Sequence, residues 1–229
     1  MYNVPFIWII FGVFALLSWI ASAQLRKKFK EYSTIPINYG LTGRDVAERM
    51  LADNGIRDVS VKSVNGELTD HYNPMNKTIN LSSEVYHGSN ISAAAVAAHE
   101  CGHAVQHAKA YAWLNLRSAL VPVVSFASRW VQWVLLAGII LVNAFPHLLL
   151  SGIILFGMIT LFSFITLPVE INASKRALVW LSNAGITTYS SYPKAQSALK
   201  WAAYTYVVAA LQSLATLIYY LMIYLRRRD

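Results

Sequence analysis

Apolar and polar stretches alternate along the chain, and four apolar stretches are candidates for helices that cross a membrane. These four are residues 4 to 23, 119 to 145, 147 to 167 and 202 to 225. The second contains Pro122, Arg129 and Gln132, so we expect its membrane part over residues 130 to 142, after a polar entry. A short link separates the second stretch from the third, which predicts a helical hairpin.

Between the first two spans, residues 31 to 118 show the shorter patterns of a small soluble unit. Thr42 and Asp45 form a capping pattern, and the helix that they open continues to Leu51 and is ended by Gly55. Three predicted strands follow: residues 58 to 64, residues 67 to 72 after a turn at Asn65-Gly66, and residues 77 to 82. We expect the first two strands to form a hairpin and the third to join them.

These elements predict a mainly α membrane protein with about four transmembrane helices and a small α+β unit that holds a short antiparallel sheet. The predicted divisions are 1–25 for the first span, 26–118 for the soluble unit, 119–168 for the hairpin, 169–201 for a further helix and loop, and 202–229 for the last span with its basic tail.

Composition agrees with a membrane protein. Hydrophobic residues make up 56% of the 229 residues, which is too apolar for an ordinary soluble enzyme. A single cysteine excludes an internal disulfide. The net charge of +8 lacks the basic helix or aromatic-basic pattern of a nucleic-acid site, so we expect no nucleic-acid partner and assign the charge to the lipid bilayer.

The basic residues also predict orientation. Arg26, Lys27, Lys28 and Lys30 follow the first span instead of preceding it, so we expect an uncleaved anchor with the next segment in the cytoplasm. The segment from residue 170 to 200 then lies on the same side. The tail Arg226-Arg227-Arg228 opposes this orientation unless the last segment re-enters the membrane or lies along it.

An alanine-rich helix is predicted over residues 90 to 108, with Asn90 or Ser92 as its N-cap. It contains His99-Glu100-Cys101-Gly102-His103, in which the two histidines lie one turn apart on one face. Two imidazoles so placed suit zinc, and Glu100 takes the general-base position of an HExxH metallopeptidase. A histidine pair that merely caps a buried helix is the alternative.

Hydrolytic zinc needs a third protein ligand and one open position. His107 shares the face of the pair, but it lies about 12 Å along the axis from His99, too far to share one metal. Glu170 is the better candidate, because a lone acid directly after a long apolar stretch should have a partner. Its alternative role is that of an acid at the N-terminus of a helix that begins at Pro168.

A family resemblance covers nearly the whole chain. The motif from His99 to His107, the upstream segments 69–74 and 80–82, and Pro168-Val169-Glu170 with Ala173-Ser174 and Arg176-Ala177 resemble the YugP-type bacterial membrane zinc metallopeptidases. This resemblance implies a gluzincin catalytic unit similar to the HtpX-type and CAAX prenyl proteases. One zinc ion per chain would be held by His99, His103 and Glu170, with Glu100 as base. Ser174 stands where the related groups commonly have Asp or Asn.

Other site residues are predicted less directly. His71, Arg176, Tyr189 and Tyr192 are candidate donors to the oxyanion, and Asn172 or Ser174 could orient a zinc-bound imidazole. Thr78, Ile79, Asn80, Leu81 and Ser82 form the candidate edge strand for substrate, with an ordinary packing strand as the alternative.

The predicted function is a metalloendopeptidase in the bacterial plasma membrane that cuts peptides or membrane proteins at the cytoplasmic face, with a role in membrane protein quality control implied by the resemblance alone. One alternative is a silent membrane scaffold with a structural zinc, whose fourth ligand would be His107 or His71. The other is an intramembrane protease of the site-2 type. That class takes an Asp as third ligand, and no Asp occurs between Asp70 and Asp229.

Overall fold

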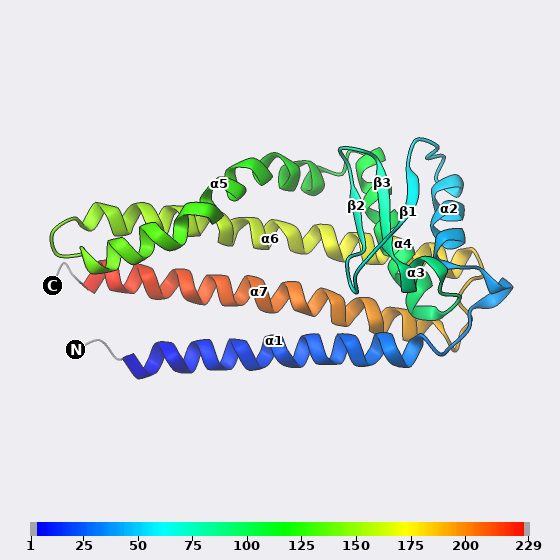
Figure 1. Ribbon diagram of the computed structural model, residues 1–229, viewed down its shortest axis with the longest axis horizontal. Coiled ribbons are helices and arrows are strands. Elements are labelled where there is room, and N and C mark those ends of the chain that lie inside the picture. Colours follow the sequence, from blue (N-terminus) through cyan, green and yellow to red (C-terminus); the bar gives the residue numbers. More distant parts are fainter. Residues whose placement is uncertain (1–3, 227–229) are drawn as a thin grey trace. The chain divides into compact units, whose positions relative to one another are not determined.

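A computed structural model describes the backbone of residues 4–226 and the side chains from residue 8 to residue 226 (Figure 1). The long helices are α1 (Val4–Tyr32), α5 (Ala112–Ile140), α6 (Pro146–Asn183) and α7 (Tyr192–Arg226). Within the described residues, these four are long and apolar enough to cross a membrane. The prediction of a mainly α membrane protein is therefore confirmed. Arg227 and Arg228 of the basic tail lie outside the described residues.

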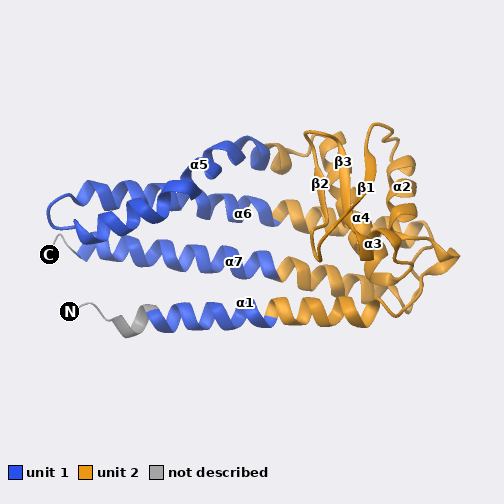
Figure 2. Ribbon diagram, in the orientation of Figure 1, with its two compact units in different colours: residues 1–20, 116–167, 205–229 blue, residues 21–115, 168–204 orange. Residues whose placement is uncertain are grey.

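The chain divides into two compact units (Figure 2). Unit 1 takes its described residues from 1–20, 116–167 and 205–229, and unit 2 comprises 21–115 and 168–204. Each long helix contributes residues to both units. All of the predicted metal ligands belong to unit 2.

In unit 1, parts of α5, α6 and α7 pack through an aliphatic and aromatic cluster. Val131, Leu135, Val142, Leu149, Ile153 and Ile223 are its buried members. The first two of these helices approach closely at Gly138, where a Cβ would lie 2.6 Å from the Cα of Leu149. This contact is that of the predicted helical hairpin. The hydroxyls of Thr160 and Ser213, 2.7 Å apart, link α6 to α7.

Unit 2 contains all of the short elements. They are the 3₁₀ turn η1 (Asn38–Gly40), α2 (Gly43–Asp53), β1 (Ser60–Val64), β2 (His71–Asn73), β3 (Thr78–Ser82), α3 (Ser83–His87) and α4 (Ile91–Ala108). Thr42 and Asp45 form the predicted capping box at the start of α2. Glycine is required next to it, because a Cβ at Gly43 would lie 2.1 Å from the carbonyl oxygen of Val85 in α3.

The sheet differs from its prediction. Its strand order is β1-β3-β2, with β1 parallel and β2 antiparallel to β3. The predicted hairpin between β1 and β2 is therefore wrong, and so is the placement of Thr78, Ile79, Asn80, Leu81 and Ser82 at an edge. The turn at Asn65-Gly66 continues into a loop that the Thr69 hydroxyl closes by donating to both of their carbonyl oxygens. β3 is the central strand, and four of its five residues are buried although only Ile79 and Leu81 are apolar.

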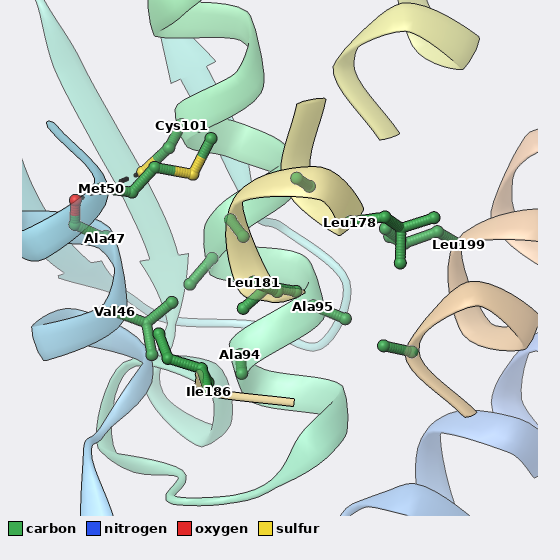
Figure 3. Close-up of a cluster of buried hydrophobic side chains, with 14 of the residues drawn as sticks. Val46, Ala47, Met50, Ala94, Ala95, Cys101, Leu178, Leu181, Ile186 and Leu199 are labelled. Atoms are coloured by element: carbon green, nitrogen blue, oxygen red, sulfur yellow. Dashed lines mark hydrogen bonds between the residues drawn. The ribbon is translucent and has the colours of Figure 1, made fainter. Parts of the chain in front are cut away.

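The core of unit 2 forms around α4 (Figure 3). Val46 and Met50 of α2 pack against it, and Leu178 and Leu181 of α6 also belong to the cluster. The Cys101 thiol donates to the carbonyl oxygen of Ala47 at 3.4 Å. Burial, followed by the charge of Glu100, raises the pKa of Cys101 well above its usual value, so this thiol is an inert core group.

α6 continues without a break through Pro168. The predicted division at residue 168 thus lies inside one helix, and Glu170 is not an acid at a helix N-terminus. A proline is tolerated inside such a long apolar helix where its neighbours satisfy the freed backbone groups.

The capping box at the start of α2 predicts that the Thr42 hydroxyl contributes to the stability of unit 2. Thr42→Ala removes the hydroxyl that accepts from the backbone N–H of Asp45, and it should lower the free energy of unfolding by about 1 kcal/mol. Thermal unfolding in detergent measures this effect. Thr42→Ser keeps the hydroxyl and serves as the matched control, and equal losses in both variants would contradict the capping role.

Candidate metal centre

α4 carries the two motif histidines on a helix that is buried along most of its length. The side chain of Asn90 accepts from the N–H of Ala93 at 2.9 Å and so caps the helix, as predicted. Small alanine side chains then allow the other elements of unit 2 to pack closely around it. The rings of His99 and His103 lie edge to face with centroids 4.8 Å apart, as expected for positions one turn apart.

Glu170 of α6 lies against both histidines. Its Oε2 is 3.3 Å from Nε2 of His99 and 3.6 Å from Nε2 of His103. Two ligand atoms each about 2.1 Å from zinc in tetrahedral geometry are about 3.4 Å apart, so both distances fit a shared zinc ion. Among the described residues, these three form the group able to hold a metal, with ligand atoms within 4.8 Å of one another. The donor set of two imidazoles and one carboxylate suits zinc.

Gly102 allows α4 and α6 to come close enough for the two histidines to contact Glu170. A Cβ at Gly102 would lie 2.6 Å from the carbonyl oxygen of Ala173, which real side chains do not tolerate. Gly102 lies between the two histidines in the sequence, and Ala173 lies between Glu170 and Ser174. The backbones of α4 and α6 therefore touch at the level of the metal site, and only glycine fits there.

The outer nitrogen of each imidazole has its own partner. The hydroxyl of Ser174 lies 3.1 Å from Nδ1 of His99, and Oε1 of Gln106 lies 3.0 Å from Nδ1 of His103. In both rings this leaves Nε2 directed toward Glu170. Such outer contacts fix the orientation of metal-binding imidazoles.

Glu100 is held beside this group by the sheet. Its Oε2 accepts from the backbone N–H of Tyr72 in β2 at 2.9 Å, and the residue is only 8% exposed. The Tyr72 hydroxyl lies 2.7 Å from Nδ1 of His107, one turn beyond His103. Tyr72 therefore attaches the edge strand β2 to α4 at two points, one of which is the predicted general base.

The carboxylate of Glu170 changes the pKa of the neighbouring His103. Burial alone would lower the pKa of His103, but the hydrogen bond and negative charge of Glu170 outweigh burial and raise it. A metal cation would take the place of that proton.

The pKa of Asp70 is raised by burial, although it accepts hydrogen bonds from the N–H and hydroxyl of Ser82. These bonds tie the segment before β2 to the end of β3.

Several other predicted residues lie near the site. Of the two residues considered for orienting an imidazole, Ser174 contacts His99, and Asn172 contacts Gln106 instead of an imidazole. Arg176 donates to the side-chain oxygen of Asn172 at 2.7 Å.

The remaining candidate oxyanion donors have other surroundings. His71 has its Nδ1 against the carbonyl oxygen of Thr69 and its Nε2 against the side chain of Asn80. Tyr189 is fully exposed, and Tyr192 packs against the core of unit 2. None of these three side chains is directed to the metal ligands by a hydrogen bond in the described structure.

The sequence analysis missed Gln106 and Tyr72. Gln106 is completely buried. Its signal was available, because residues three apart on a helix are neighbours and a buried amide must find partners. The role of Tyr72 had no such signal, because it acts through a backbone N–H that only the folded sheet brings to Glu100.

Comparisons with known proteins agree with this geometry. The profile of the family described as "Putative neutral zinc metallopeptidase" matches residues 7–225. The chain is also 43% identical over 213 residues to a Bacillus subtilis (strain 168) protein described as "Putative membrane protease YugP", covering 93% of this chain and 94% of that protein. No solved structure matches significantly. The chain belongs to this zinc metallopeptidase family.

The contact between α4 and α6 gives a direct prediction. Gly102→Ala should force the two helices apart and lower the free energy of unfolding by about 1–3 kcal/mol. It should also weaken zinc binding at least tenfold, as is typical when the hydrogen-bond partners of metal ligands are lost. Zinc content after dialysis and thermal unfolding measure the two effects. Gly12→Ala on α1 has no neighbouring atom within 4 Å and is the control. Normal zinc content in the Gly102 variant would contradict the close contact.

Proposed function

We propose that this member of the zinc metallopeptidase family is an endopeptidase that cuts polypeptides at the cytoplasmic face of a bacterial plasma membrane. One zinc ion per chain is held by His99, His103 and Glu170, and Glu100 is the general base. The observation that carries the proposal is the three-ligand group on α4 and α6, with Glu100 one residue from a ligand. Three protein ligands with one open position are typical of catalytic zinc.

Zinc bound at this site supplies Lewis-acid chemistry to a peptide carbonyl and to water. The residues of the chain do the rest. A carboxylate oxygen of Glu100 takes a proton from the water that attacks the scissile carbonyl and passes it to the nitrogen of the leaving amine. The Tyr72 N–H holds that carboxylate in position, and burial of the site excludes excess water.

The proposed substrate is an extended polypeptide beside β2. This strand forms one edge of the sheet, and its Tyr72 N–H faces Glu100 rather than β3, so a peptide along this edge passes the general base. A cavity of about 660 Å³ in unit 2 is lined by Val96, one turn before Glu100, and by Asp70, two residues before Tyr72. None of the metal ligands, nor Glu100 or Tyr72, lines this cavity, so it is proposed as space for a more distant part of the substrate.

The side of the membrane is proposed from charge. Four basic residues lie between Arg26 and Lys30 at the end of α1, and Lys175, Arg176, Lys194 and Lys200 lie in the part of the chain that follows Glu170. Both groups belong to unit 2, as the ligands do. A cytoplasmic excess of Lys and Arg is the usual rule, so we place the site there.

The relation to the HtpX-type and CAAX prenyl proteases is part of the same proposal. It is supported by a His, His, Glu donor set whose carboxylate comes from a second helix. We place the biological role in membrane protein quality control on the basis of this resemblance.

The alternative functions have less support. A structural zinc would need a fourth ligand, yet His107 is engaged by the Tyr72 hydroxyl and both ring nitrogens of His71 have other partners. An intramembrane protease would carry its motif on a spanning helix. α4 is not among the described helices that are long and apolar enough to span.

The proposed function predicts opposite effects for two substitutions. Glu170→Ala should abolish both zinc binding and peptidase activity, because it removes a ligand. Glu100→Gln should keep zinc at about one ion per chain and lower kcat by about 10²- to 10⁴-fold, because it removes only the base. Metal analysis and hydrolysis of an unfolded protein substrate, both in detergent, measure these effects.

Glu48→Gln is the control for these variants, because Glu48 is exposed on α2 and forms an ion pair with Arg44 of the same helix. Wild-type activity in Glu100→Gln would exclude Glu100 as the base. Full zinc content in Glu170→Ala would exclude the third ligand, and zinc without peptidase activity in the wild type would favour the scaffold.

A further inference from the structure

We propose that a directed chain of hydrogen bonds from Arg176 through Asn172 and Gln106 fixes the tautomer of His103, so that Nε2 is the nitrogen available to a metal. Arg176, Asn172 and Gln106 are then positioning residues and not ligands. This inference rests on the proposed zinc site, and it adds how the chain prepares one ligand before the metal arrives.

The chain begins at a group that can only donate. A guanidinium has five N–H donors and no acceptor. The Nε of Arg176 lies 2.7 Å from the side-chain atom Oδ1 of Asn172, one turn earlier on α6. This contact requires an oxygen at that position of Asn172, so the orientation of the Asn172 amide is determined by chemistry and not by shape alone.

The second step fixes Gln106, which is completely buried. One end of its amide lies 3.0 Å from Oδ1 of Asn172 and 2.8 Å from the backbone carbonyl oxygen of Val169. Both neighbours are acceptors, so this end of the amide must be the NH₂ group. The opposite end is then the carbonyl oxygen Oε1, which lies 3.0 Å from Nδ1 of His103.

The last step follows from the same rule. Because Oε1 of Gln106 can only accept, Nδ1 of the His103 ring must carry a hydrogen. In the neutral ring, the lone pair is then on Nε2, the atom that lies 3.6 Å from Glu170. The ligand atom of His103 is therefore selected by residues on the far side of the ring from the proposed metal.

His99 is held in a different way. Its Nδ1 meets the hydroxyl of Ser174, and a hydroxyl can either donate or accept. The contact orients the ring but does not by itself impose a tautomer. The two histidine ligands thus differ, and the polar chain through Gln106 makes His103 the ligand that is set in advance.

Three isosteric or nearly isosteric variants separate hydrogen-bond direction from packing. Gln106→Leu removes the acceptor at His103. Gln106→Glu keeps an acceptor there, but turns a second oxygen toward the acceptors of Val169 and Asn172. Asn172→Asp keeps an acceptor for both Arg176 and Gln106, so it is the matched control.

Zinc affinity, measured by competition with a chelator, should fall about 10- to 100-fold in Gln106→Leu, the range typical of lost partners of metal-binding histidines. Zinc affinity should fall by no more than about threefold in Gln106→Glu and Asn172→Asp, because both variants keep an acceptor at Nδ1 of His103. Thermal unfolding of the metal-free protein should instead be lowest for Gln106→Glu, whose buried oxygens repel. If zinc affinity follows metal-free stability across the three variants, the groups act by packing and the proposal is overturned.

A spectroscopic measurement tests the tautomer without metal. ¹⁵N NMR of histidine-labelled wild-type protein in chelator should show hydrogen on Nδ1 of His103, whether or not Nε2 also carries a hydrogen toward Glu170. A His103 ring whose Nδ1 carries no hydrogen in the wild type would overturn the proposal. Because this readout needs neither zinc nor activity, it distinguishes failure of the hydrogen-bond chain from failure of the proposed peptidase function.

Discussion

The close approach of α4 and α6 at Gly102 and Ala173 is the contact on which the metal site depends. It brings the histidine pair of one helix to the carboxylate of the other, although these residues lie far apart in the sequence. Helices with ordinary side chains pack with axes 8–10 Å apart, and small residues allow a closer approach. Because the backbones touch here, the short side chains of His99, His103 and Glu170 reach a common point.

The same contact accounts for how the site is supported. With α4 against α6, Ser174 reaches His99, and Gln106 reaches the backbone and side chains of α6. Burying so many polar groups is costly unless each has a partner. Residues of α6 are partners of His99 and Gln106, and the Tyr72 N–H of β2 is a partner of Glu100. The centre is thus prepared by two elements that are distant in the chain.

The unbroken helix α6 belongs to both compact units. A single helix contributes apolar residues to unit 1 and the third ligand to unit 2. The sheet contributes differently, since β3 is the buried centre and β2 is an edge held to α4 through Tyr72 and His107. The ligands therefore come from helices, and the base is positioned by a strand.

The sequence by itself predicted the four apolar helices, the caps of α2 and α4, and the grouping of Glu170 with the histidine pair. These features depend on local periodicity and on the high cost of a lone buried charge. The sequence failed for the sheet, since a turn signal at Asn65-Gly66 says nothing about which strand has two buried faces. It also missed Gln106 and the Tyr72 N–H, whose partners come from other elements. Only the tertiary structure decided these features, because strand order and the direction of buried hydrogen bonds are set by contacts between distant segments.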